Sequence, residues 1–84
     1  MASTEERVKQ VIAKQLNVDI SDVKDEARFI EDLGAESMQS LELIAAFEEE
    51  FDMSLDEDEA GKVKTVGQAV KFFEDLLEGK GNLT

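Results

Sequence analysis

The amino-acid sequence predicts an all-α fold: a small four-helix bundle of three longer helices and one short helix, with a long loop between helices one and two. Three segments repeat apolar residues at the spacing of an amphipathic helix, and no segment alternates polar and apolar residues as a half-buried strand does. The 84 residues include no proline, no internal repeat and no low-complexity linker. Because this length suits one domain and 42% of the residues are hydrophobic, we expect the chain to fold by itself.

The first helix is predicted by a cap at its start. Ser3 and Glu6 have the spacing of a capping box, in which each side chain accepts a hydrogen bond from the backbone N–H of the other residue. The apolar residues that follow share one helical face to about Leu16. Residues 17–34 mix turn-forming residues with scattered apolar anchors, which predicts a long, partly packed loop with short helical turns in it.

The second helix is predicted to begin near Glu36 or Ser37 and to run to about Phe51. Gly34 ends the loop that precedes it. The main apolar face of this helix is expected to hold Met38, Leu41, Ile44, Ala45 and Phe51, with Leu43 and Phe47 widening it. Three acidic residues fall outside this face and are expected to be exposed: Glu42, Glu48 and Glu49.

A short third helix and a longer fourth helix complete the bundle. Residues 56–59 are all acidic and suit a helix N-terminus, whereas Gly61 weakens a helix by about 1 kcal/mol relative to alanine. Thr65 and Gln68 form a second capping box before a full apolar face made of Val66, Ala69, Val70, Phe73, Leu76 and Leu77. Gly79 to Asn82 are expected to end this helix, and residues 79–84 to form a mobile tail.

Acidic residues are concentrated in the middle of the chain. Residues 1–28 contain six acids and five bases, and residues 62–84 contain three acids and four bases, whereas residues 29–61 contain twelve acids and no base. The net charge of −12 therefore arises in this middle segment. Such a field repels nucleic acid and anionic membranes and favours basic protein surfaces, although a run of charge alone also fits a solvated helix face.

Two residue types that carry much of enzyme chemistry are missing. The absence of cysteine excludes disulfides and thiolate metal sites, and the absence of histidine removes the commonest metal ligand and the usual general base. No apolar run reaches the roughly 20 residues that a membrane span needs, and the N-terminal residues lack the apolar stretch of a secretory signal. We therefore expect a cytoplasmic protein without a membrane span.

Ser37 lies in the segment LGAESMQSLEL, and three roles are open to it. It fits an ordinary first-turn residue of a helix. It is a poor candidate for a hydrolase nucleophile, because there is no histidine and residues 29–61 contain no lysine or arginine that could act as a base. It also fits an acceptor of a phosphoryl group from another enzyme, because the amides and the dipole of a helix start favour a phosphate there.

A calcium-binding module is a rival interpretation. Asp56, Asp58 and Gly61 fit positions 1, 3 and 6 of an EF-hand loop. Ala60 and Gly67 occupy positions 5 and 12, where ligands are required. We therefore predict no specific metal site, and only weak binding of divalent cations to the acidic helix surfaces.

At these residues the sequence resembles the acyl carrier proteins. The segment FIEDLGAESMQSLELIAAFEEEFD, residues 29–52, is similar to the core of that family, and the resemblance continues through TEERVKQVIAKQLNV and KVKTVGQAV over nearly the whole chain. It implies a right-handed bundle, a single acyl-carrier domain over residues 1–84, and a carrier that is a substrate of enzymes and not itself an enzyme. Ser37 would carry 4'-phosphopantetheine, donated from coenzyme A by a phosphopantetheinyl transferase and joined through a phosphodiester. The arm ends in a thiol, on which acyl groups would travel as thioesters to fatty-acid or polyketide-type enzymes.

The resemblance also implies how partners and cargo are held. The second helix would meet basic patches on acyl-processing enzymes through Glu36, Glu42, Glu48 and Glu49, with Glu57 and Asp58 as further docking acids at the third helix. We expect a monomer whose interior shelters the acyl chain. The candidate lining residues of this acyl pocket are Met38, Ile44, Ala45, Phe47, Val63, Val66 and Val70.

Four positions depart from the usual family pattern. Glu36 replaces the usual aspartate, Met38 the usual leucine, and Gln39 and Gly61 stand where acids are common. These departures suggest a secondary carrier that serves a dedicated pathway. A carrier of aminoacyl or peptidyl groups and an acidic interaction domain that is never modified remain alternatives, although the acidity of the second helix favours a free-standing acyl carrier.

Overall fold

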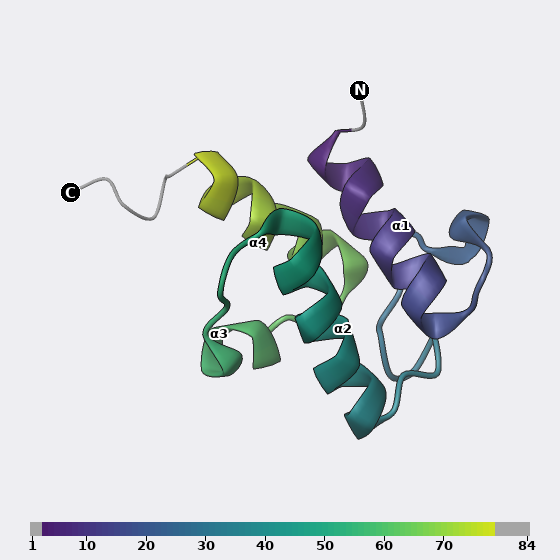
Figure 1. The fold of residues 1–84 in the computed structure, drawn as a ribbon. Coiled ribbons are helices and arrows are strands. Elements are labelled where there is room, and N and C mark those ends of the chain that lie inside the picture. The colour runs from purple at the N-terminus through teal and green to yellow at the C-terminus, as the bar shows by residue number, and fades with distance from the viewer. Residues whose placement is uncertain (1–2, 79–84) are drawn as a thin grey trace.

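The computed structural model describes residues 3–78, with Ser37 and Glu78 described by their backbone alone. Four α-helices and one short 3-10 turn follow one another along the chain (Figure 1). The expected end of the last helix at residues 79–82 and the expected tail lie outside the described residues. Within residues 3–78 there is no strand, so the all-α prediction of three longer helices and one short helix is confirmed. The elements are α1 (Thr4–Leu16), η1 (Ile20–Asp22), α2 (Ser37–Phe51), α3 (Glu57–Gly61) and α4 (Val66–Glu78).

Both predicted capping boxes are present. The backbone N–H of Ser3 donates to Glu6 Oε1 at 3.0 Å, and the N–H of Glu6 donates to Ser3 Oγ at 3.1 Å. At the start of α4, the N–H groups of Thr65 and Gln68 each donate to the other residue's side-chain oxygen at 3.2 Å. These bonds satisfy donors that a helix start otherwise leaves without partners, which is why both boundaries follow from local sequence.

The core lies where α1 packs against both α2 and α4. Figure 1 shows the short α3 on the side of α2 away from α1. Three phenylalanines form the centre: the Phe73 ring lies 4.8 Å from the Phe47 ring and 4.7 Å from the Phe51 ring, centroid to centroid. Each of the three is at most 7% exposed. Aromatic packing between α2 and α4 therefore contributes much of the buried apolar surface.

The buried face of α2 is narrower than the predicted one, of which only a part is buried. Leu43, Phe47 and Phe51 face the core, whereas Met38 is 73% exposed, Leu41 is 60% exposed and Ala45 is also exposed. Both sets of residues recur at helical spacing, so periodicity alone did not separate them. The structure buries the set with two aromatic rings, because those rings pack against Phe73 of α4. The outer face of α2 consequently combines apolar and acidic residues.

A contact between α1 and α2 neutralises one acid of the second helix. Arg7 Nε lies 2.9 Å from Glu50 Oε2, and Arg7 Nη2 donates to the backbone oxygen of Glu50 at 2.8 Å. The same guanidinium lies over the Phe51 ring, 4.4 Å from its centroid. Arginine suits this place because its planar group can donate to a carboxylate and stack on a ring at once.

The long loop between α1 and α2 is tied to the start of α4. Phe29 N–H donates to the oxygen of Lys64, and Val66 N–H donates to the oxygen of Ala27, both at 3.0 Å. Gly67 N–H donates to Asp25 O at 2.8 Å, and a Cβ on Gly67 would lie only 3.0 Å from that oxygen. A side chain here would press on the Asp25 carbonyl, so glycine suits this close approach, which holds residues 25–29 beside α4.

A tight turn then leads the chain into α2. The backbone oxygen of Arg28 accepts hydrogen bonds from the N–H groups of Asp32 and Leu33 at 3.0 and 3.1 Å. Gly34 has φ +73°, a left-handed conformation that glycine adopts without strain. Ala35 is buried, and its N–H donates to Phe29 O at 2.8 Å. These bonds fix the direction in which the backbone enters α2.

The hydrogen bonds of this turn make the contribution of the Asp32 carboxylate to stability dependent on pH. The pKa of Asp32 lies below its ordinary value, first because the Arg28 N–H donates to Oδ2 at 2.8 Å and then because the Arg28 side chain does so at 3.3 Å. The ionised Asp32 carboxylate is stabilised in the folded state, so it contributes to stability at every pH above its unfolded pKa of about 3.9. This contribution disappears as the pH falls through the lower pKa that Asp32 has in the folded state. In an NMR titration of the carboxyl carbon, we expect Arg28→Ala to raise the Asp32 pKa only part of the way to its ordinary value, because the backbone donor remains. A wild-type Asp32 that titrates as an ordinary aspartate would contradict this account of the turn.

Candidate functional site

The backbone at the start of α2 sets the position of residue 37. Ser37 is the first residue of the helix, and Glu36 is its extended N-cap, with φ −98° and ψ 171°. The N–H of Glu36 donates to Gln39 Oε1 at 3.0 Å. Gln39 thus has a local role: its side chain closes the first turn, which a carboxylate at this position would also do at the cost of one more negative charge.

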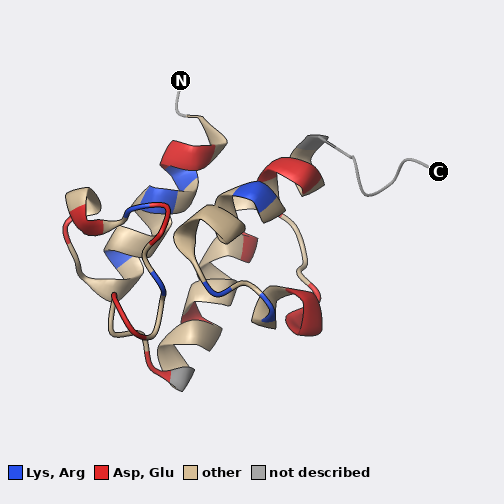
Figure 2. Cartoon of the chain, turned by 180° about the vertical axis from the view of Figure 1, so that it is seen from behind, with Lys and Arg blue, Asp and Glu red and all other residues tan. Residues whose placement is uncertain are grey.

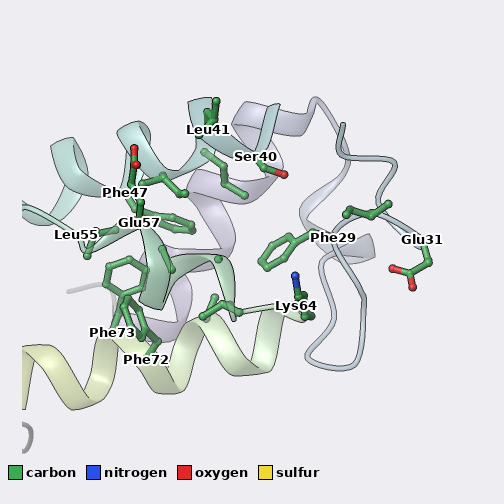
Figure 3. A pocket seen from close by; sticks show the side chains of 17 residues that line it. Phe29, Glu31, Ser40, Leu41, Phe47, Leu55, Glu57, Lys64, Phe72 and Phe73 are labelled. Carbon is green, nitrogen blue, oxygen red and sulfur yellow. The ribbon is translucent and has the colours of Figure 1, made fainter. Parts of the chain in front are cut away.

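A cavity of about 470 Å³ opens beside α2 (Figure 3). This volume lies within the range of sites that bind small molecules in proteins. Its walls come from the turn before α2, from α2, α3 and α4, and from the loops that flank α3. The lining residues are Phe29, Ile30, Glu31, Ser40, Leu41, Leu43, Ile44, Phe47, Leu55, Glu57, Ala60, Gly61, Val63, Lys64, Ala69, Phe72 and Phe73.

The register of α2 puts position 37 at one end of this cavity. Ser40, Leu41 and Ile44 line it and follow Ser37 by three, four and seven residues, the spacing of one helical face. Figure 3 shows Ser40 and Lys64 at the end nearest the start of α2, and Phe72 and Phe73 at the other. The cavity therefore has polar side chains near position 37, together with the Phe29 ring, and is mainly aromatic at its far end, where Glu57 is the charged lining residue.

The residues predicted for an acyl pocket lie in three places. Ile44, Phe47 and Val63 line the cavity. Met38 and Ala45 belong to the exposed face of α2, and Val66 and Val70 are buried in the core; none of these four lines the cavity. Phe29 and Phe72 were missed, the first because it lies in the loop and the second because it falls outside the apolar face expected for the fourth helix.

The predicted docking acids share one electrostatic property. Among the described side chains, none of the six forms an ion pair, whereas Glu50 pairs with Arg7 and Glu59 pairs with Lys62 at 3.3 Å. Five of the six are exposed, and Figure 2 shows acidic segments on α2 and α3 with no basic segment on either helix. Their negative charge is available to a basic partner surface. The six acids are Glu36, Glu42, Glu48, Glu49, Glu57 and Asp58.

Glu48 differs from the other five because it also supports the fold. This side chain is half-buried, and Oε2 accepts a hydrogen bond from the N–H of Leu55, a cavity-lining residue, at 2.8 Å. The backbone oxygen of Glu48 accepts from Asp52, which is left-handed at φ 53°, and from Met53 at 3.1 Å. Glu48 thus anchors the loop that leads from α2 to α3.

We expect Glu48→Ala to lower the free energy of unfolding by about 1 to 2 kcal/mol, because the Leu55 N–H loses a charged acceptor. Glu49→Ala is the matched control, since Glu49 is exposed and should change stability by no more than about 0.5 kcal/mol. Urea denaturation followed by circular dichroism measures both. Equal values for the two variants would show that the bond to Leu55 contributes nothing.

The segment that fits EF-hand positions forms α3 and the start of α4 instead of a ligand loop. Among residues 3–78, no three acidic side chains are placed together to hold a metal ion. No described helix combines the length and the apolar character required to cross a bilayer.

Comparison with known proteins identifies the family. The family described as "Phosphopantetheine attachment site" matches residues 6–73, which includes α2, the cavity and most of α4. A solved structure described as "a putative acyl carrier protein" from Mycobacterium tuberculosis superposes with a TM-score of 0.75 at 29% sequence identity, over 82% of this chain and 92% of that chain. Domains of this family are sites of covalent 4'-phosphopantetheine attachment, and as carriers they interact with phosphopantetheinyl transferases and acyl-processing enzymes. The chain therefore belongs to the phosphopantetheine attachment-site family and is an acyl carrier protein by family.

Proposed function

We propose that this carrier holds 4'-phosphopantetheine on Ser37, within one carrier domain over residues 1–84, and delivers acyl groups to fatty-acid or polyketide-type enzymes. When bound, the group supplies a thiol on which acyl chains travel as thioesters. One observation carries the proposal: position 37 begins the helix whose next two turns line a largely apolar cavity. A group attached there starts at the rim of a space that can shelter an acyl chain.

The chain's own residues fit such a group. Aromatic and aliphatic side chains at the far end of the cavity exclude water and favour an apolar chain over a polar one. Polar side chains, among them Ser40 and Lys64, lie at the end beside position 37, where the more polar arm would pass. The fit therefore favours an acyl cargo over an aminoacyl or peptidyl cargo, whose polar groups would lose water in the aromatic end without gaining partners.

Partner recognition follows from the acids on α2 and α3. We propose that Glu36, Glu42 and Glu49, with Glu57 and Asp58, meet basic surfaces of the transferase and of acyl-processing enzymes, and that Glu48 combines such contact with its support of the loop. Exposed pairs contribute about 0 to 1 kcal/mol each, so several together give fast and reversible docking. The proposal includes a cytoplasmic monomer that serves a dedicated pathway. Equal turnover by a general fatty-acid ketosynthase, compared with a standard carrier, would count against that specialisation.

Intact mass after incubation with coenzyme A and a phosphopantetheinyl transferase tests the proposal. We expect one phosphopantetheine on the wild-type chain, none on Ser37→Ala, and full addition to the matched control Ser21→Ala, an exposed serine of η1 that does not line the cavity. Addition that survives Ser37→Ala, or no addition to a folded wild-type chain, would overturn the assignment. Mass analysis of the chain purified from its own cell would then separate acyl from aminoacyl cargo.

A further inference from the structure

Lys64 stands out among the residues that line the cavity. Among the described residues of the lining it is the only cationic one, it is exposed, and it forms no ion pair with any side chain described in residues 3–78. The other charged lining residues are two acids, and one of these, Glu31, already has Arg28 at 3.6 Å. An ammonium with no partner at the opening of an apolar cavity is complementary to an anion that the chain itself does not supply.

Backbone hydrogen bonds place Lys64 near the proposed attachment site. The oxygen of Lys64 accepts from Phe29 N–H at 3.0 Å, and the oxygen of Phe29 accepts from Ala35 N–H at 2.8 Å. Three backbone segments therefore lie side by side, and Ala35 precedes Ser37 by two residues. Figure 3 shows the Lys64 nitrogen beside the Phe29 ring, at the same end of the cavity as Ser40.

We propose that Lys64 and Ser40 hold the phosphopantetheine arm against the mouth of the cavity, with the ammonium paired to the phosphodiester and the Ser40 hydroxyl bonded to the arm. This inference rests on attachment at Ser37. The phosphodiester remains beside position 37 because it is bonded there, and the neighbouring Glu36 carboxylate repels it. Lys64 offsets that repulsion, and its flexible four-carbon stem allows its ammonium to follow the arm.

An anionic cargo is the other partner that Lys64 could select. The far end of the cavity argues against it, because that end is built from Phe47, Phe72 and Phe73, and a carboxylate placed there would lose its water without a partner. Ser40 also fits the arm better. Its hydroxyl makes no hydrogen bond to another described residue and faces the polar end, where the amides of the arm offer both donors and acceptors.

NMR of the apo and holo forms tests the role of Lys64 without any enzyme assay of the loaded carrier. Lys64→Gln removes the charge, Lys64→Arg keeps it, and Lys14→Gln is the matched control, since Lys14 is an exposed lysine of α1 that does not line the cavity. Intact mass first establishes phosphopantetheine on Ser37 in each variant. If no variant is loaded, attachment itself fails. If all are loaded, the arm can be tested separately.

In the wild type we expect holo formation to shift the backbone amides of residues 29, 40 and 64 and to slow the motion of the phosphorus seen by ³¹P relaxation. In Lys64→Gln both effects should fall about two- to fivefold, as for loss of one exposed ion pair, while Lys64→Arg and Lys14→Gln stay near the wild type. High salt should weaken the amide shifts and the slowing of phosphorus motion in the wild type more than in Lys64→Gln.

Identical amide shifts and phosphorus relaxation in wild type and Lys64→Gln would overturn the proposal. Effects that depend on Lys64 only after loading with a dicarboxylic acyl group would also overturn it and would assign Lys64 to the cargo.

Discussion

Phe73→Ala is expected to lower the free energy of unfolding by about 3 to 5 kcal/mol, the largest change in stability that the structure predicts. The ring is 2% exposed and packs on Phe47 and Phe51, and it meets Phe72 edge-on at 5.3 Å. Truncation leaves a void that rigid neighbouring rings cannot fill. A domain of this size has a total stability of roughly 4 to 13 kcal/mol, so this loss is a large share of the total.

Urea denaturation at low temperature, followed by circular dichroism, gives this value with Leu76→Ala as the control. Leu76 lies on the same helix but is 41% exposed, so its truncation should cost about 1 kcal/mol or less. The denaturant slope should be unchanged in both variants if unfolding remains two-state. A loss below 1 kcal/mol in Phe73→Ala would mean that the ring stack is not the centre of the core.

The double variant Glu42→Lys and Glu49→Lys should slow phosphopantetheine transfer by about tenfold or more at low salt. Both acids are exposed on the outer face of α2, and neither forms an ion pair with a described side chain. Reversal of two charges on this exposed face is expected to change the association rate with a basic partner much more than it changes the fold. The measurement is kcat/KM of a transferase, at low salt and again at high salt, where the difference from the wild type should shrink.

A matched change of net charge separates local docking from overall attraction. Asp19→Lys with Asp22→Lys makes the same change at the exposed η1 segment, which Figure 1 shows on the far side of α1 from α2. We expect this control to slow transfer at most twofold. If the two double variants slow transfer equally, total charge and not the α2 face governs association. If neither does, the docking surface lies elsewhere.

The features that the sequence predicted correctly depend on interactions between residues close together in the chain. The starts of α1 and α4 follow from capping boxes whose partners are three residues apart, and the structure contains both. The start of α2 was predicted near Glu36 or Ser37, after a loop that Gly34 ends, and the structure begins the helix at Ser37. These features depend on neighbours along the chain, so no knowledge of the folded arrangement was required.

The features that the sequence predicted incorrectly depend on contacts between residues far apart in the chain. Two faces of α2 had the same helical period, and only the packing of Phe47 and Phe51 on Phe73 decided which one is buried. Phe29 reaches the cavity through its backbone pairing with Lys64, a contact between residues 35 positions apart that no local pattern encodes. Of the seven residues predicted for an acyl pocket, three line the cavity.

The hydrogen bonds that tie residues 25–29 to Ala35 and to the start of α4 do not pass through α3. The path of the backbone into residue 37 is therefore tied to the start of α4 by bonds that do not involve α3. If Ser37 carries the arm as proposed, an enzyme that docks on α2 would meet every intermediate from the same starting point.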